Sequence, residues 1–89
     1  MRLKVSLSPE ADSFLIRLIR TNEKLYRIFQ THIDKLPEVY QKDLLLTGAP
    51  LKGVRRHRVG DYRIIYRVIH DQLLIYVIEI GHRREVYDR

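Results

Sequence analysis

Residues 54–80 decide the fold of this chain; they read VRRHRVGDYRIIYRVIHDQLLIYVIEI. Three runs within this stretch are rich in Val, Ile and Tyr, which favour β-strands. The gaps between them, Gly60-Asp61 and His70-Asp71-Gln72, are short and polar, as in the turns of antiparallel hairpins. We therefore predict three antiparallel strands at residues 54–59, 61–69 and 73–80. Because the third run is apolar on both faces as far as Glu79, it should be the buried central strand.

Side-chain alternation predicts which residues share a face of this sheet, because neighbours along a strand point to opposite sides. The set expected to pack beneath helices is Tyr62, Ile64, Tyr66, Val68, Leu74, Tyr76, Ile78 and Ile80. His57 and Val59 should point the same way. The set expected on the opposite face is Arg56, Arg58, Arg63, Arg67 and Glu79. A polyanion bound on that face would relieve the repulsion among its arginines.

Residues 2–46 predict one strand followed by helices. Residues 2–7 alternate polar and apolar side chains, which is typical of a half-buried strand. Ser8 can cap a helix that begins at Pro9, and Asn22 can cap a second helix. Pro37 should end or kink that helix at the preceding residue. Residues 39–46 should add a short helical piece, before a loop at residues 47–50. The apolar stripes of the two main helices are Phe14, Leu15, Leu18 and Ile19, and then Leu25, Ile28, Phe29, Ile33 and Leu36.

The order of these elements predicts an α+β fold. A strand, two to three helices and then three strands make a mostly antiparallel sheet with the helices packed on one face. A last short extended piece is expected at residues 84–87. The length of 89 residues allows one domain, residues 1–89. The sheet face without helices is then free for a ligand.

The charge of the chain favours an anionic partner. Seventeen Lys and Arg against eleven Asp and Glu give a formal net charge of +6. Arginine recurs in the C-terminal half of the chain. Its planar guanidinium group can donate two hydrogen bonds to the same phosphate. A merely solvated basic face is the alternative interpretation. The arginines concerned lie at positions 55, 56, 58, 63, 67, 83, 84 and 89.

The composition also excludes several classes of site. The chain has no cysteine, so it has no disulfide framework and no cysteine-ligated metal. Its four histidines lack metal-ligand spacing, and we expect neither a metal nor a cofactor. The longest apolar run, residues 73–78, is too short to cross a bilayer, and the N-terminus lacks a signal peptide. We therefore expect a cytoplasmic protein without a membrane partner.

Three motifs in the C-terminal half carry a resemblance to a known family. They are Leu51-Lys52-Gly53, the run RHRVGDYRIIY at residues 56–66, and IGHR with EVY at residues 80–83 and 85–87. With the length and the element order, they make the chain resemble the RelE branch of the RelE/ParE toxin superfamily. The Gly-Asp-Tyr-Arg block followed by Gly-His-Arg is specific for the superfamily more than for the branch.

The resemblance implies a type II toxin that cleaves messenger RNA in the ribosomal A site without a metal. The 2′-hydroxyl attacks the adjacent phosphorus and leaves a 2′,3′-cyclic phosphate and a 5′-hydroxyl. Arg63 and Arg83 would stabilise charge on the phosphate, Tyr87 would stack on a base or exchange a proton, and His82 suits acid–base work. The RNA-binding residues that we expect are Lys52, Arg55, Arg56, Arg58, Arg67 and Arg84.

The sequence leaves the general base and the target open. Well-known family members carry lysines where this chain has Arg56 and Arg58, and arginine does not deprotonate in proteins. His57, His82 and Glu79 are the candidates for the base, and Glu79 is alternatively a salt-bridge partner of an arginine. The competing functions are a ParE-type inhibitor of DNA gyrase and a catalytically weak RNA- or antitoxin-binding homologue. The expected partners are messenger and ribosomal RNA and a small acidic RelB-like antitoxin.

Overall fold

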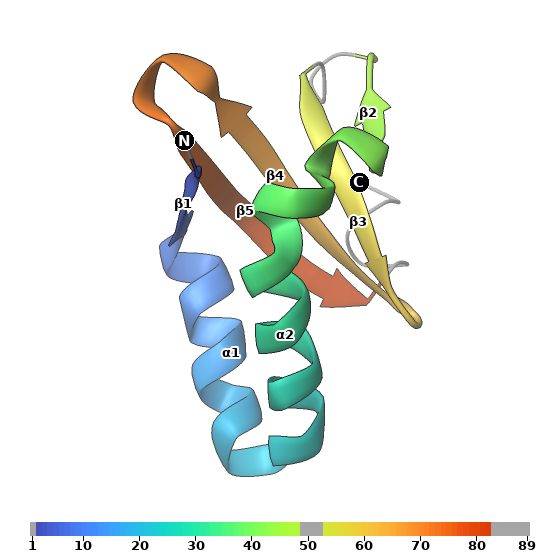
Figure 1. Ribbon diagram of the computed structural model, residues 1–89. Helices are drawn as coiled ribbons and strands as arrows, with labels where there is room; N and C mark the ends of the chain where they lie inside the picture. Colours follow the sequence, from blue (N-terminus) through green and yellow to red (C-terminus); the bar gives the residue numbers. More distant parts are fainter. Residues whose placement is uncertain (1, 49–52, 83–89) are drawn as a thin grey trace.

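The chain forms a five-stranded sheet with a helical hairpin against it (Figure 1). The computed structural model describes residues 2–48 and 53–82. The α+β fold with a mostly antiparallel sheet is confirmed, whereas the extended piece expected at residues 84–87 lies outside the described residues. The elements are β1 (Lys4–Leu7), α1 (Pro9–Thr21), α2 (Glu23–Val39), η1 (Tyr40–Lys42), β2 (Leu44–Leu46), β3 (Val54–Val59), β4 (Tyr62–Ile69), η2 (His70–Gln72) and β5 (Leu74–His82).

The strands lie in the order β1-β5-β4-β3-β2. β1 runs parallel to β5, and every other neighbouring pair is antiparallel. The middle strand is therefore β4. The prediction that residues 73–80, now β5, form the central strand was wrong, because β5 lies next to the centre. β5 is nevertheless an inner strand, because β1 pairs with its second edge. This pairing explains why β5 is apolar on both faces over most of its length.

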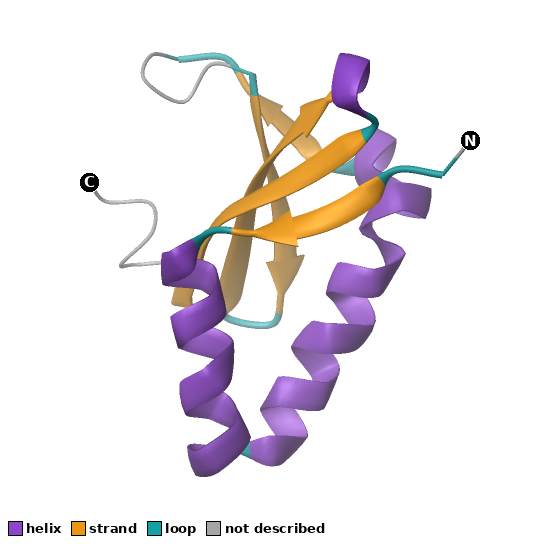
Figure 2. Ribbon diagram, turned by 90° about the vertical axis from the view of Figure 1, so that its left-hand side faces the viewer, coloured by secondary structure: helices purple, strands orange, loops and turns teal. Residues whose placement is uncertain are grey.

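The two helices form a hairpin whose tip, at Asn22, projects beyond the sheet (Figures 1 and 2). Ser8 caps α1 as predicted, accepting a hydrogen bond from the Ala11 N–H at 3.0 Å. Asn22 caps α2 by accepting from the Leu25 N–H at 3.2 Å. Ile19 and Ile28, expected in the apolar stripes, are 48% and 40% exposed. Their helical turns lie near the projecting tip, where no strand is available to cover them.

The segment after α2 differs from the prediction. Pro37 does not end the helix at Leu36: α2 continues through Pro37 to Val39, although the proline lacks an N–H for the helical bond. Residues 39–46 are not one helical piece. After the short η1, Leu44–Leu46 form β2, an edge strand that pairs antiparallel with β3. The backbone pairing with β3 decides this conformation.

The main core lies between the helices and one face of the sheet. Tyr62, Ile64, Tyr66 and Val68 all pack there, as alternation on β4 predicts. From the two helices, Ala11, Phe29 and Leu36 are fully buried in this core. No described helix is long and apolar enough to cross a membrane.

A β-bulge in β5 corrects the predicted faces of that strand. Tyr66 pairs with Val77, but its neighbour Ile65 pairs with Glu79, so Ile78 is an extra residue. Ile75, Val77 and Ile80 therefore face the main core. Leu74, Tyr76 and Ile78, expected there, were assigned to the wrong face. Ile78 instead packs with Val54 and Ile65 in a small second cluster on the opposite side.

Candidate nucleic-acid interface

The sheet side away from the main core carries Arg56, Arg58, Arg63 and Arg67, and we call it the arginine face. Directly paired residues of neighbouring strands point to the same side. Arg58 is paired with Arg63, and Arg56 is paired with Ile65, a member of the second cluster. The convergence of these arginines on one face, predicted from alternation, is thus confirmed by the strand register.

The arginine face is organised as three rows that cross β3, β4 and β5. The first row is Arg58, Arg63 and Gly81. The second row is Arg56, Ile65 and Glu79. The third row is Val54, Arg67 and Tyr76. Cationic, apolar, acidic and aromatic side chains thus lie together on one surface, where the cations can contact phosphates and the aromatic ring can stack on a base.

The arginines of these rows differ in exposure. Arg58 and Arg67 are exposed, and Arg56 is half-buried. Arg63 is only 4% exposed, and its Nη1 donates to the carbonyl oxygen of Tyr62 at 3.4 Å. A buried guanidinium acts through a weaker solvent screen than an exposed one. Arg63 therefore suits the stabilisation of charge, whereas Arg58 and Arg67 suit the first contacts with a polyanion.

The turn before β3 lies close to the guanidinium of Arg67. Gly53 has a φ of +81°, a conformation that side-chain-bearing residues rarely adopt. A Cβ atom at Gly53 would lie 3.1 Å from Nη1 of Arg67. The glycine thus allows the guanidinium of Arg67 to lie close against the backbone of the turn.

Tyr76 and Lys4 are residues of this face that the sequence analysis did not place on it. Tyr76 lies beside Arg67 because of the bulge, and it is half-buried rather than part of the core. Lys4, exposed on β1, is paired with Leu74. Leu74 is also paired with Ile69, which alternates in phase with Arg67, so Lys4 lies on the arginine face. The alternation of residues 2–7 places Lys4 on the side opposite the apolar residues of that strand. It does not reveal that β1 pairs with β5, and so it does not place Lys4 beside the arginines.

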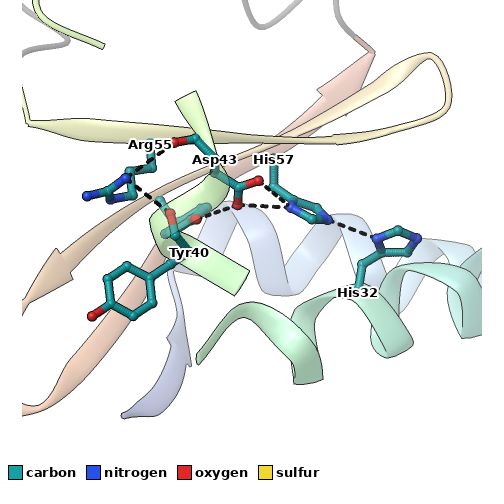
Figure 3. A network of polar contacts seen from close by, with 6 residues as sticks. His32, Tyr40, Asp43, Arg55 and His57 are labelled. Atoms are coloured by element: carbon teal, nitrogen blue, oxygen red, sulfur yellow. Dashed lines mark hydrogen bonds and ion pairs between the residues drawn. The ribbon is translucent and has the colours of Figure 1, made fainter. Parts of the chain in front are cut away.

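Two of the expected site residues lie on the other side of the sheet. Arg55 donates through Nη1 to the carbonyl oxygens of Tyr40 (3.1 Å) and Asp43 (3.3 Å), and its guanidinium carbon lies 5.5 Å from the Tyr40 ring centroid (Figure 3). His82 is paired with Tyr62, and their ring centroids are 5.7 Å apart. Both side chains are thereby separated from the arginine face. Glu79 is the base candidate that the register places on it.

His57 points toward the helices, as predicted, and is joined to other polar groups there. Its Nδ1 lies 2.9 Å from each carboxylate oxygen of Asp43, and its Nε2 lies 2.9 Å from Nδ1 of His32 (Figure 3). His32 on α2 is half-buried and lies against His57. Among residues 2–48 and 53–82, no three His, Asp or Glu side chains are grouped to hold a metal ion. The expected site residues outside the described part of the chain are Lys52, Arg83, Arg84 and Tyr87.

A helical hairpin on one sheet face and an arginine array on the other define a class of small, basic α+β proteins. Residues 5–87 match the family model of the ParE toxin of the type II toxin–antitoxin system parDE. The chain belongs to the RelE/ParE superfamily of type II toxins. No curated protein sequence matches the chain significantly.

Solved structures share the fold over nearly the full chain. The toxin–antitoxin complex RelBE2 from Mycobacterium tuberculosis has a TM-score of 0.79 at 19% identity, covering 93% of this chain and 100% of that chain. A RelE mutant from E. coli in the free state has a TM-score of 0.74 at 19% identity, covering 99% and 93%. The archaeal RelE–RelB complex from Pyrococcus horikoshii has a TM-score of 0.69 at 27% identity, covering 93% and 97%. These similarities support membership of the superfamily and a RelE-like fold. They do not distinguish one branch of the superfamily from another.

Proposed function

We propose that this toxin belongs to the RelE branch and cleaves messenger RNA in the ribosomal A site. The observation that carries the proposal is the arginine face, with three rows of side chains across β3, β4 and β5. A gyrase inhibitor needs only a binding surface. A buried Arg63 flanked by exposed arginines and by Glu79 suits a surface that also stabilises a transition state.

Each described member of the face has a role in this proposal. Arg56, Arg58 and Arg67 hold the sugar–phosphate backbone by charge-assisted hydrogen bonds. Arg63 stabilises the negative charge that grows on the phosphorane when the 2′-hydroxyl attacks phosphorus. Glu79 accepts the proton of that hydroxyl, since it is the carboxylate of the three rows. The P–O5′ bond then breaks, giving a 2′,3′-cyclic phosphate and a 5′-hydroxyl once a proton reaches the leaving oxygen.

The remaining roles rest on the sequence motifs. Arg83 would share the phosphate charge with Arg63, and Tyr87 would stack on a base or protonate the leaving oxygen. Lys52 and Arg84 would add contacts to the RNA backbone. His82, at the end of β5, is the alternative proton donor or acceptor. The strand register supports Glu79 more strongly, because Glu79 and not His82 lies on the arginine face. No step in this scheme uses a metal or a cofactor.

An acidic antitoxin is the expected protein partner. The net charge of +6 favours an acidic protein, and it would make the association fast and sensitive to salt. The relatives from M. tuberculosis and P. horikoshii were solved as complexes of a toxin with an antitoxin. We propose a small RelB-like antitoxin for this chain, with both proteins in the cytoplasm and ribosomal RNA as a further contact of the toxin.

The decisive experiment is cleavage of a defined message on programmed ribosomes. We expect primer extension to show cuts in the A-site codon with the wild-type protein and with Arg17→Gln. Arg17 is an exposed arginine of α1, so this variant is a matched loss of charge on another surface. Arg58→Gln should lose most of the cleavage. Intact messages with an active wild-type protein in a growth-arrest assay would reject the nuclease proposal.

Gyrase inhibition is the second candidate, because the matching family model is the ParE toxin. It predicts that purified gyrase loses supercoiling activity in the presence of the toxin while ribosome-bound messages stay intact. Binding of RNA without either effect would indicate the catalytically weak homologue. Message cleavage, gyrase supercoiling and RNA binding, measured on one protein preparation, therefore separate all three functions.

A further inference from the structure

A chain of four polar side chains crosses the covered side of the sheet, and the proposed reaction uses none of them (Figure 3). The hydroxyl of Tyr66, on β4, donates to Oδ2 of Asp43 at 2.5 Å. Asp43, between η1 and β2, accepts from Nδ1 of His57 on β3. Nε2 of His57 lies 2.9 Å from Nδ1 of His32 on α2. Side chains from four separate segments are thus joined in one line.

This line begins where the backbone pairing of β3 with β2 stops. The β2–β3 ladder ends at the pair Leu44–Arg56. Asp43 directly precedes Leu44, and His57 directly follows Arg56, so their side chains continue the contact by one step. On the β2 side, the part of β3 that carries Arg58 is therefore held by side chains instead of by a described strand. Arg56 and Arg58 flank His57 and point to the opposite face.

The hydrogen bond between His32 and His57 can persist when the pair takes up one proton, but not when it takes up two. Because Asp43 accepts from Nδ1–H of His57, Nε2 of a neutral His57 is an acceptor, and Nδ1–H of His32 donates to it. One additional proton can be taken up at the outer nitrogen of His32 while the contact persists. A second additional proton makes both rings cationic, and both facing nitrogens then carry hydrogen. The hydrogen bond between His32 and His57 is then lost.

The charged groups around the pair favour this opening in acid. Burial, then His57 and Lys35, lower the pKa of His32 below its ordinary value, and Asp43 acts in the opposite direction. Lys35 lies on α2 like His32, and its ammonium group disfavours a second cation there. On the far side of Asp43 lie Arg55 and the hydroxyl of Tyr66. Tyr40, on η1, completes the set through its contacts with Arg55.

We propose that His32, His57 and Asp43 form a proton-sensitive latch for the arginine-bearing end of β3. With the latch closed, α2 and η1 hold the strand and keep Arg56 and Arg58 in a preorganised pair. In acid the His32–His57 bond opens, the end of β3 is held less firmly, and the polyanion is bound more weakly. His32 and His57 are positioning residues in this proposal, which rests on the proposed RNA contact of Arg56 and Arg58.

The test uses the full chain and a single-stranded RNA whose 2′-hydroxyls are methylated, so that binding is measured without cleavage. Asn places an amide where His32 has Nδ1: its NH2 group donates to a neutral His57, and after the amide turns over its oxygen accepts from a protonated His57, so His32→Asn keeps the latch closed at every pH. His32→Leu removes the donor. The binding constant is measured from about pH 5 to pH 8, the range of histidine titration, at constant ionic strength. His70→Asn, an exposed turn residue, is the matched control for the loss of one titratable charge.

We expect wild type and His32→Asn to bind equally near pH 8 and to differ by about fivefold near pH 5, which is the scale of ordering one long side chain. His32→Leu should bind about fivefold more weakly than wild type near pH 8. His70→Asn should follow the wild-type profile. If His32→Asn keeps the wild-type pH profile, or if His32→Leu binds as wild type near pH 8, the latch is rejected.

A second measurement separates the latch from the proposed function. In the free protein, the backbone amide signals of Arg56 and Arg58 should shift in acid with the midpoint of the second proton taken up by the His32–His57 pair, and the shift should be clearly smaller in His32→Asn. If no RNA binds at any pH, the proposed function fails and the amide titration alone decides on the latch. Amide signals that shift equally in wild type and in His32→Asn would overturn it.

Discussion

The hydroxyl of Ser8 and the carbonyl oxygen of Ile78 are joined by a hydrogen bond of 2.6 Å. The same Ser8 oxygen accepts from the Ala11 N–H. One buried side chain therefore caps α1 and donates to the carbonyl oxygen of Ile78, the bulge residue. The bulge in turn sets Glu79 opposite Ile65 on the arginine face. The start of the first helix is thus linked to the proposed general base.

Ser8→Ala should lower the free energy of unfolding by about 2 kcal/mol. The substitution removes a helix cap and also leaves a buried carbonyl without its hydroxyl partner. Urea unfolding measures this loss. Thr31→Ala, which removes an exposed hydroxyl bonded to the helical carbonyl of Arg27, is the control and should change stability by less than about 0.5 kcal/mol. Equal losses in the two variants would contradict the double role of Ser8.

Arg63→Lys should reduce the cleavage rate on the ribosome by about 100-fold, the usual scale for loss of one stabilising donor. Lysine keeps the positive charge but cannot present the planar fork to two phosphate oxygens. Single-turnover cleavage measures the effect, and a thermal melt checks that the variant is folded. A wild-type rate in Arg63→Lys would remove Arg63 from the transition state.

Neutralising an exposed arginine of the rows should weaken RNA binding in a salt-dependent way. For single strands, each lost phosphate contact should reduce the slope of log K against log salt by about 0.7. We expect this reduction for Arg58→Gln and for Arg67→Gln in titrations of methylated RNA. Arg20→Gln, on the projecting helical hairpin, should leave the slope unchanged. Equal slopes in all three variants would show that the RNA does not use the arginine face.

Tyr76→Ala should weaken RNA binding by about 1–3 kcal/mol if a base stacks on the ring beside Arg67. Tyr76→Phe should bind as wild type, because the stacking surface is retained. Fluorescence anisotropy with the methylated RNA measures both. The idea fails if the alanine variant binds like the phenylalanine variant.

Stability should fall in alkali because of Tyr66. Burial and the hydrogen bond to Asp43 raise the pKa of Tyr66 above its ordinary value of about 10. The unfolded chain therefore loses this proton first, so the contribution is fully present below about pH 10 and is lost as the pH rises further. Tyr66→Phe should lower the free energy of unfolding near pH 8 by about 1–3 kcal/mol and should flatten the alkaline slope. Urea unfolding from pH 8 to about pH 11 measures both effects, and an unchanged slope would contradict the assignment.

Short-range patterns were sufficient to predict β3 and β4. Val54–Val59 was predicted with its observed bounds, and the alternation of Arg63, Ile65 and Arg67 was confirmed by the register. The helix caps Ser8 and Asn22 were readable because a cap acts within three residues. These features depend on neighbours in the sequence, so the sequence contains their cause.

The features that escaped prediction depend on distant partners. The bulge at Ile78 is held by Ser8, so no local pattern in β5 announces it. Leu44–Leu46 shows no alternation, and only its pairing with β3 makes it a strand. The contact between His32 and His57 joins a helix to a strand. Each of these is decided by tertiary packing, which overrides local preference.

The parallel pairing of β1 with β5 also bears on the synthesis of the toxin. β1 is made first and β5 is the last described strand, yet β5 is the one that joins β1 to the rest of the sheet. A nascent chain that ends before β5 lacks both this junction and the rows that include Glu79 and Tyr76. Contacts between residues so far apart are made late and slowly. The arginine face should therefore be incomplete until β5, the last strand that the structure describes, has been made.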